Sequence, residues 1–229
     1  MSIYAIGDLH LSFNTPKPMN IFGNNWENHE EKIKLDWLSK VKEEDTVIHP
    51  GDFSWAINLK DATKDFEYLN SLPGKKIMLK GNHEYWWTTI TNMKNFLQEN
   101  NFKNIEFLQN NSIEVEDKVI CGTRGWTLVN EETQNSKKIL KREALRLELS
   151  IQDGLNKNKE IIVFMHYPPI TKQNLNTEFM KILQKYNIKK CYYAHLHGHS
   201  INDAVQGIVN QIEFKLVSAD ALDFKLLKI

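Results

Sequence analysis

Short apolar runs alternate with amphipathic stretches through the first half of the chain. Three runs predict buried strands: Ile3–Ile6, Thr46–His49 and Lys76–Leu79. Apolar residues at helical spacing follow each run and predict helices from about 28 to 42, around 62–69 and around 90–97. A strand–helix unit that occurs three times implies parallel strands joined by right-handed crossovers.

The pattern changes in the middle of the chain. Ile105–Leu108, Ser112–Val115 and Lys118–Cys121 are short strand-like runs separated by Asn-Asn and Glu-Asp, which predicts hairpins. A long helix should follow, because Leu140, Ala144, Leu147, Ile151 and Leu155 form one apolar stripe. The remaining predictions are a strand at Ile161–Met165, a helix around 179–186, a strand at Lys190–Ala194, and β-structure from Ile208 to Leu216 and on to Leu227.

A polar segment from Ser12 to Asn25 interrupts the early pattern. It is longer than most connections inside a domain, which favours a functional loop. The sequence has no internal repeat, low-complexity tract or Ser/Gly linker, so we expect one domain over residues 1–229.

Composition excludes several classes of protein. Lys plus Arg equals Asp plus Glu, at 29 each, so net charge does not favour nucleic acid or a membrane surface. Cys121 and Cys191 lie far apart in apolar runs, which predicts buried reduced thiols. No apolar run approaches the ~20 residues of a membrane span, and the N-terminal residues do not resemble a signal peptide. A cytoplasmic location is the expectation.

Five segments with metal-ligating residue types come directly after strand-like runs. They are Asp8-Leu9-His10, Gly51-Asp52, Gly81-Asn82-His83-Glu84, His166 and His195-Leu196-His197. Ligands of open α/β sheets bind outside the carboxyl ends of the strands. Aspartate, asparagine and imidazole without cysteine suit Mn²⁺, Fe, Zn²⁺ or similar ions. Singly, such residues are usually caps or satisfied polar groups, and their joint occurrence indicates a metal site.

The order and spacing of these segments resemble the calcineurin-like metallophosphoesterase superfamily. Its pattern is D-x-H, G-D, G-N-H-[D/E], a lone H and G-H-x-H, and all five parts occur here in order. The last part departs from the pattern, because Ala194 stands where Gly is usual. The resemblance implies an α/β fold, a four-layer α/β/β/α sandwich of two mixed sheets flanked by helices.

The resemblance also implies two divalent metal ions. One would be held by Asp8, His10, Asp52 and His197. The other would be held by Asp52, Asn82, His166 and His195, with Asp52 shared between the two. His83 would face the substrate without binding metal.

The chemistry implied is hydrolysis of a phosphomonoester or phosphodiester. Paired metals clamp the attacking and leaving oxygens and provide a bridging hydroxide for in-line attack. His83 would stabilise the developing charge or protonate the leaving group.

Other residues near these segments have two readings each. Glu84 is expected to cap the following helix or to orient His83. Trp55, Trp86, Trp87 and Trp126 either rim a pocket or pack loops onto the domain. Arg124 is either a phosphate clamp or a salt-bridge partner.

Within the superfamily, a small phosphate ester or nucleotide is the expected substrate. Protein phosphatases carry Asp-Arg-Gly shortly after Gly-Asp, and no Arg follows Asp52 here. Nuclease action is less expected, because the chain has no basic stripe. The alternatives are a nuclease, a protein phosphatase or a non-catalytic metal-binding scaffold. The sequence does not indicate the oligomeric state.

Overall fold

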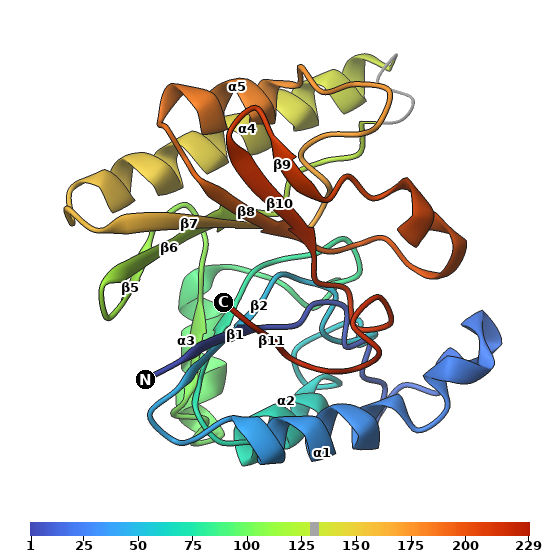
Figure 1. Cartoon of the computed structure of the whole chain (residues 1–229). Coiled ribbons are helices and arrows are strands. Elements are labelled where there is room, and N and C mark those ends of the chain that lie inside the picture. The colour runs from blue at the N-terminus through green and yellow to red at the C-terminus, as the bar shows by residue number, and fades with distance from the viewer. Residues whose placement is uncertain (129–132) are drawn as a thin grey trace.

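The computed structural model describes residues 1–128 and 133–229. Two β-sheets face each other, and helices cover both outer faces (Figure 1). This is the four-layer α/β/β/α sandwich that the sequence predicts, so the fold prediction is confirmed.

The first sheet has five strands in the order β11-β1-β2-β3-β4. Their bounds are Ile3–Ala5 (β1), Thr46–His49 (β2), Lys75–Met78 (β3), Ile105–Phe107 (β4) and Leu227–Lys228 (β11). Strands β1 to β4 are parallel, and β11 runs antiparallel to β1. The carboxyl ends of the parallel strands therefore meet at one edge.

The second sheet has six strands in the order β5-β6-β7-β8-β10-β9. Their bounds are Ile113–Val115 (β5), Lys118–Thr123 (β6), Glu160–Met165 (β7), Lys190–Tyr193 (β8), Gly207–Val209 (β9) and Ile212–Leu216 (β10). Strands β6, β7, β8 and β10 are parallel, whereas β5 and β9 are antiparallel to their neighbours.

Three helices pack on the first sheet and two on the second (Figure 1). Their bounds are His29–Lys40 (α1), Thr63–Ser71 (α2), Ile90–Glu99 (α3), Gln134–Leu155 (α4) and Glu178–Lys185 (α5). Thr89, Thr133 and Thr177 start α3, α4 and α5, each accepting a backbone N–H from three residues ahead. The five predicted helices are all present.

Side chains of the strands alternate between two cores. On β2, Val47 packs under the helices of the first sheet, while Ile48 packs against the second sheet. On β7, Val163 faces α4 and α5, while Ile162 and Phe164 face the first sheet. Alternation with a period of two explains why these strands are apolar throughout. Cys121 and Cys191 are buried free thiols, as predicted.

One prediction for the middle of the chain is wrong. Ile105–Leu108 does not form a hairpin with the following run, because β4 pairs in parallel with β3 at the edge of the first sheet. The Asn110-Asn111 segment instead carries the chain across to the second sheet, where β5 and β6 form the other predicted hairpin. The tail supplies strands to both sheets.

The polar segment after His10 folds into two 3-10 turns, Met19–Phe22 and Asn24–Trp26. A third 3-10 segment, Gly198–Asp203, follows the last of the five motif segments. Among the described residues, no helix combines the length and apolar character that a membrane span requires.

Candidate metal centre

The structure brings the seven predicted metal ligands together at one edge of the sandwich. They follow the carboxyl ends of β1, β2, β3, β7 and β8, so each sheet contributes part of the site. The residues are Asp8 and His10, then Asp52, then Asn82, then His166, and finally His195 and His197.

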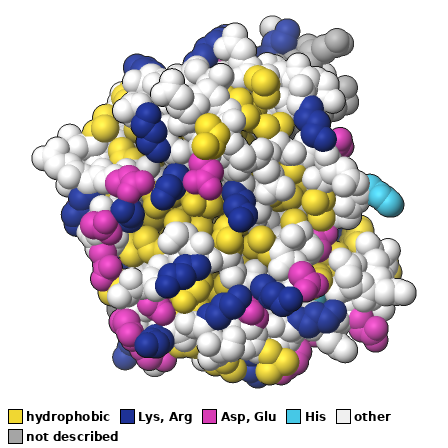
Figure 2. Space-filling view, in the orientation of Figure 1, with side chains coloured by type: hydrophobic (Ala, Val, Ile, Leu, Met, Phe, Trp, Pro, Cys, Tyr) yellow, Lys and Arg dark blue, Asp and Glu magenta, His cyan; other side chains and the backbone are white. Residues whose placement is uncertain are grey.

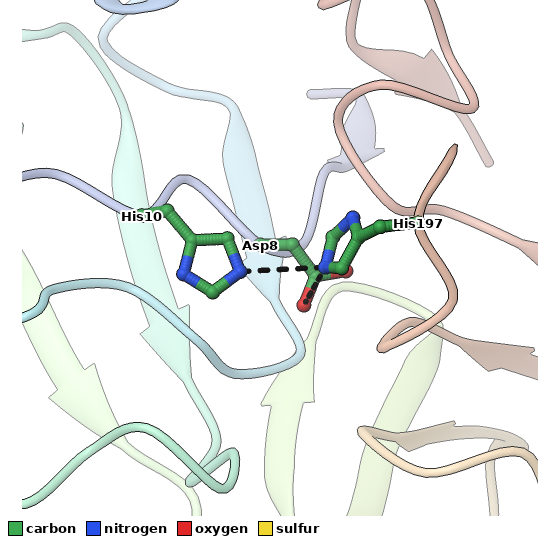
Figure 3. Close-up of side chains that lie close together, drawn as sticks. All are labelled: Asp8, His10 and His197. Atoms are coloured by element: carbon green, nitrogen blue, oxygen red, sulfur yellow. Dashed lines mark hydrogen bonds and ion pairs between the residues drawn. The ribbon is translucent and has the colours of Figure 1, made fainter. Parts of the chain in front are cut away.

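One group of donor atoms comes from Asp8, His10 and His197 (Figure 3). The Nε2 atoms of His10 and His197 face each other at 3.3 Å. Oδ1 of Asp8 lies 3.6 Å from Nε2 of His197. The three donor atoms lie within 4.8 Å of one another, a spacing that could hold a metal ion.

A second group comes from Asp52, His166 and His195, also within 4.8 Å. Oδ1 of Asn82 joins this group, 2.6 Å from Nε2 of His166. Oδ2 of Asp52 lies 3.5 Å from Nε2 of His166 and 3.8 Å from Nε2 of His10. Asp52 therefore stands between the two groups, where a shared ligand would have to lie.

Four of these residues have left-handed backbone conformations. The φ angles are 58° at Asp8, 46° at His10, 56° at Asp52 and 76° at His195. Residues other than glycine rarely adopt this region, and such residues concentrate at functional sites. Backbone hydrogen bonds hold the turns, because Asp8 N donates to Gly51 O at 2.9 Å and His10 N donates to Asp52 O at 3.0 Å.

The donor atoms are better placed to bind cations than to form hydrogen bonds with one another. Oδ1 of Asp8 is buried and has no hydrogen-bond partner among the described residues. Burial is the main cause that lowers the pKa of His10 and of His166, so both rings are neutral and offer lone pairs. Burial, followed by the charges of Glu84 and Asp8, raises the pKa of Asp52 well above its ordinary value. Cations bound here would relieve the crowding of the carboxylates.

Neighbouring groups orient the imidazoles. Nδ1 of His166 lies 3.1 Å from the carbonyl of Pro50, which leaves Nε2 facing the site. Nδ1 of His197 lies 3.0 Å from Oδ1 of Asp220, and Oδ2 of Asp220 accepts the Gly198 N–H at 2.9 Å. Metal-binding histidines usually donate their second nitrogen in this way. Asp220 was not predicted, because it lies 23 residues beyond His197 in no motif.

His83 lies beside these groups. Its Nε2 is 3.9 Å from Oδ2 of Asp52, and 30% of its side chain is exposed. Burial, followed by the positive charge of Lys17, lowers the pKa of His83 to about 4. The ring is therefore neutral near pH 7 in the free protein and faces solvent that a substrate could displace.

The polar loop after His10 adds two features that the sequence did not indicate. Nζ of Lys17 lies 3.2 Å from the ring centre of Trp55, a cation–π contact. Trp55 stacks on His10 at 4.8 Å and contacts His83 at 4.2 Å between ring centres. The loop thus places a positive charge next to His83.

Glu84 was expected to cap the following helix or to orient His83, and the structure gives it a different role. Thr89 caps α3 instead, and the carboxylate of Glu84 is buried. It accepts the backbone N–H groups of Asp52 at 3.1 Å, of Phe53 and of Gly81. Glu84 therefore ties the turn after β2 to the turn after β3, and so holds Asp52 next to Asn82.

The four tryptophans divide between the two readings. Trp86 is buried against Phe66 in the first core, so it packs a loop. Trp126 packs on the second core, 5.9 Å from Tyr167. Trp87 lines a polar cavity beside the site. Of the four tryptophans, only Trp55 makes ring contacts with predicted site residues in the part of the chain that the structure describes. These residues are His10 and His83.

The departure at Ala194 is explained by Gly7. A Cβ on Gly7 would lie 2.7 Å from the Cβ of Ala194, so a methyl group fits at Ala194 because Gly7 has none. Gly7 N also donates to Val217 O at 2.7 Å. The two sheets therefore approach closely at this point.

A cavity of about 600 Å³ extends from the site on the side of the second sheet. His195 and Tyr167 line it, and the centres of their rings lie 4.2 Å apart. Leu128, Ile170 and Leu196 give it apolar walls.

Residues 1–199 match the family model for calcineurin-like phosphoesterases. Comparison with curated protein sequences finds no match.

Solved structures resemble the whole fold. A protein of unknown function from Aquifex aeolicus is 20% identical, with a TM-score of 0.52 over 99% of this chain and 95% of that one. The phosphopantetheinyl hydrolase of Mycobacterium tuberculosis is 14% identical, with a TM-score of 0.52 over 100% and 95%. A protein from Thermus thermophilus is 13% identical, with a TM-score of 0.59 over 99% and 97%. At these identities the structures support the fold alone. The family model spans all five motif segments, and on that match the chain belongs to the calcineurin-like phosphoesterase family.

Proposed function

We propose that this protein is a phosphoesterase that uses two divalent metal ions to hydrolyse a small phosphomonoester or phosphodiester. The observation that carries the proposal is the pair of donor groups on either side of Asp52, with His83 next to them. Asp8, His10, Asp52 and His197 would hold one ion. Asp52, Asn82, His166 and His195 would hold the other. Mn²⁺, Fe and Zn²⁺ all suit such donors.

The bound ions would supply positive charge for a phosphate ester and lower the pKa of a water molecule that attacks it. The residues of the chain fix the geometry of that reaction. The left-handed turns and the hydrogen bonds of Glu84 and Asp220 hold the donors in place before any ligand arrives. Preorganised groups contribute more to catalysis than groups that must move during the reaction.

His83 would act on the leaving group or on the charge that develops in the transition state. Because its pKa is lowered to about 4, a free site holds the neutral ring, which donates a hydrogen bond through one nitrogen. A bound phosphate would bring negative charge next to Lys17 and His83 and so favour protonation of the ring. His83 then gives a proton to the departing oxygen.

The cavity beside His195 favours a small organic ester. Its volume of about 600 Å³ falls in the range typical of small-molecule sites. Lys, Arg, Asp and Glu side chains are interspersed over the face drawn in Figure 2. A cavity of this size does not favour a nucleic-acid substrate, and the missing Arg after Asp52 disfavours a phosphoprotein.

An assay of purified protein tests the proposal. The protein is incubated with Mn²⁺ and either 4-nitrophenyl phosphate or bis(4-nitrophenyl) phosphate, and a chelator is added in parallel. We expect release of 4-nitrophenol from at least one ester and its loss on chelation. If two ions are bound and neither ester reacts, the non-catalytic scaffold becomes the better reading.

Substitution of His83 separates catalysis from metal binding. We expect His83→Ala to lower kcat by about 100-fold or more, because general acid catalysis contributes that much. Both metals should stay bound, measured as metal content per protein. His199→Ala is the matched control, since His199 is an exposed imidazole in the neighbouring 3-10 segment. Loss of metal from His83→Ala would show that His83 is a ligand.

A further inference from the structure

The polar cavity lined by Trp87 lies beside the candidate metal centre, at the carboxyl ends of β3 and β6. Its volume is about 190 Å³, and the cations Lys80, Arg124 and Arg146 line it. Glu143 is the one carboxylate among the residues described there. The lining therefore has an excess of two positive charges.

The buried carboxylate of Glu143 contacts two of these cations. Only 1% of its side chain is exposed. Its Oε1 lies 2.7 Å from Nη1 of Arg146 and 3.4 Å from Nη2 of Arg124, and Oε2 accepts the Thr123 hydroxyl at 2.9 Å. One carboxylate thus fixes two guanidinium groups without neutralising both.

Arg124 and Lys80, which line the cavity, are not fully paired within the part of the chain that the structure describes. Nε of Arg124 is buried and has no hydrogen-bond partner among the described residues. The Arg124 guanidinium also stacks on Trp126 at 4.9 Å, so its position is fixed. Lys80 forms no ion pair with a residue that the structure describes. Fixed cations with free donors are suited to binding an anion.

The cavity is close to the proposed metal ligands along the chain. Lys80 precedes Asn82 by two residues, which span at most about 7 Å. On the other wall, the carbonyl of Arg124 accepts the N–H of Tyr167 at 2.9 Å, and Tyr167 follows His166. A compact molecule could therefore reach both places.

Building on the proposed function, we infer that this cavity binds a second phosphoryl group of the substrate. A phosphate monoester carries about −1.5 to −2 charges at pH 7, which matches the excess of two positive charges. A carboxylate would leave one of them uncompensated. Guanidinium groups also pair with phosphate through two parallel hydrogen bonds. The substrate class is then a small molecule with two phosphoryl groups a few bonds apart.

Binding of inorganic phosphate to the chelator-treated protein tests the cavity without any reaction. The readout is the affinity measured by calorimetry for wild type, Arg146→Gln and Arg142→Gln. Arg142 is the matched control, because it also contacts Glu143, at 3.6 Å, but is 53% exposed and does not line the cavity. We expect Arg146→Gln to weaken binding about tenfold, as for a lost hydrogen bond to a charged group, and Arg142→Gln to leave it unchanged. Equal affinities in all three proteins, or no binding to wild type, would overturn the inference.

A second measurement asks whether the phosphoryl group belongs to the substrate. Propane-1,3-diyl bisphosphate and propyl phosphate are compared as inhibitors of 4-nitrophenyl phosphate hydrolysis. We expect the bisphosphate to bind at least about tenfold more tightly, and this advantage to fall in Arg146→Gln but not in Arg142→Gln. Equal inhibition by both compounds, with phosphate binding intact, would make the cavity a site for free phosphate and overturn its role in substrate binding. If no ester is hydrolysed, the proposed function fails, while the calorimetric result still decides whether the cavity binds phosphate.

Discussion

At the scale of single residues, the histidines depend on groups that the motifs do not contain. His197 faces the candidate metal site with Nε2 because Asp220 holds Nδ1 at 3.0 Å. The motif segments were visible in the sequence, since each combines ligand types with a strand end. Asp220 was not visible, because a lone aspartate in a late loop has no feature in the sequence that separates it from other loop aspartates. The position of Lys17 could not be predicted either, because it lies in a loop that has no periodic pattern of apolar residues.

Removal of the Asp220 carboxylate should weaken metal binding. We expect Asp220→Ala to lower Mn²⁺ affinity by about 10- to 100-fold, because His197 loses the partner that fixes its ring and tautomer. A titration with Mn²⁺ measures the change. Asp223→Ala is the control, since that carboxylate is 82% exposed and pairs with Lys225. Equal affinities in both variants would show that Asp220 does not orient His197.

At the scale of elements, strand positions were more predictable than strand partners. The strand–helix order up to α3 and the buried strand β7 follow from apolar spacing alone. Strand β4 pairs with β3 so that Ile77 lies opposite Glu106. This pairing could not be predicted from β4, because a run of three residues has too little pattern to indicate its partner. The two-residue strand β11 was located only as β-structure in the tail. Short strands are defined by their neighbours, which a single sequence does not name.

Strand β3 also contains a buried charge. The side chain of Lys76 is fully buried, and its ammonium donates to the carbonyl of Leu72. Burial lowers its pKa to about 8. The folded state therefore loses the proton near pH 8, whereas the unfolded chain keeps it to about pH 10.5. The cost of the buried charge is full below pH 8 and is relieved as the pH rises from 8 to 10.5.

Replacement of this lysine by an apolar residue of similar length should stabilise the protein. We expect Lys76→Met to raise the free energy of unfolding by about 1–3 kcal/mol at pH 7, with a smaller gain at pH 10. Asn104 Nδ2 still donates to Leu72 O, at 3.4 Å. Denaturant titrations at the two pH values measure the effect. Lys75→Met is the control, because Lys75 is 44% exposed on the same strand and should change stability by less than about 0.5 kcal/mol. A gain that does not depend on pH would contradict the assignment to charge.

At the scale of the whole molecule, the site depends on how the two sheets are seated. Asp8, His10, Asp52 and Asn82 belong to the first sheet, whereas His166, His195 and His197 belong to the second. The sheets meet beside the site through Gly7 and Ala194. The sequence showed that Ala194 stands where Gly is usual. It did not show that the missing side chain of Gly7 provides the space for the methyl group.

A methyl group on Gly7 should push the sheets apart. We expect Gly7→Ala to destabilise the fold by about 1–3 kcal/mol, since the two Cβ atoms would lie 2.7 Å apart. Ala194→Gly in the same chain should restore part of the loss. Unfolding free energies of the two single variants and the double variant form the cycle that measures this coupling. Strictly additive effects would show that the strain comes from Pro50, the next nearest contact at 3.2 Å.

The division of donors between the sheets makes each proposed ion a cross-link as well as a cofactor. An ion that needs both sheets binds the native protein and not the unfolded chain, so its free concentration shifts the folding equilibrium. The melting temperature then becomes a property of the solution as much as of the polypeptide. A series of thermal melts at graded metal concentrations would amount to a binding isotherm, obtained with no substrate in hand.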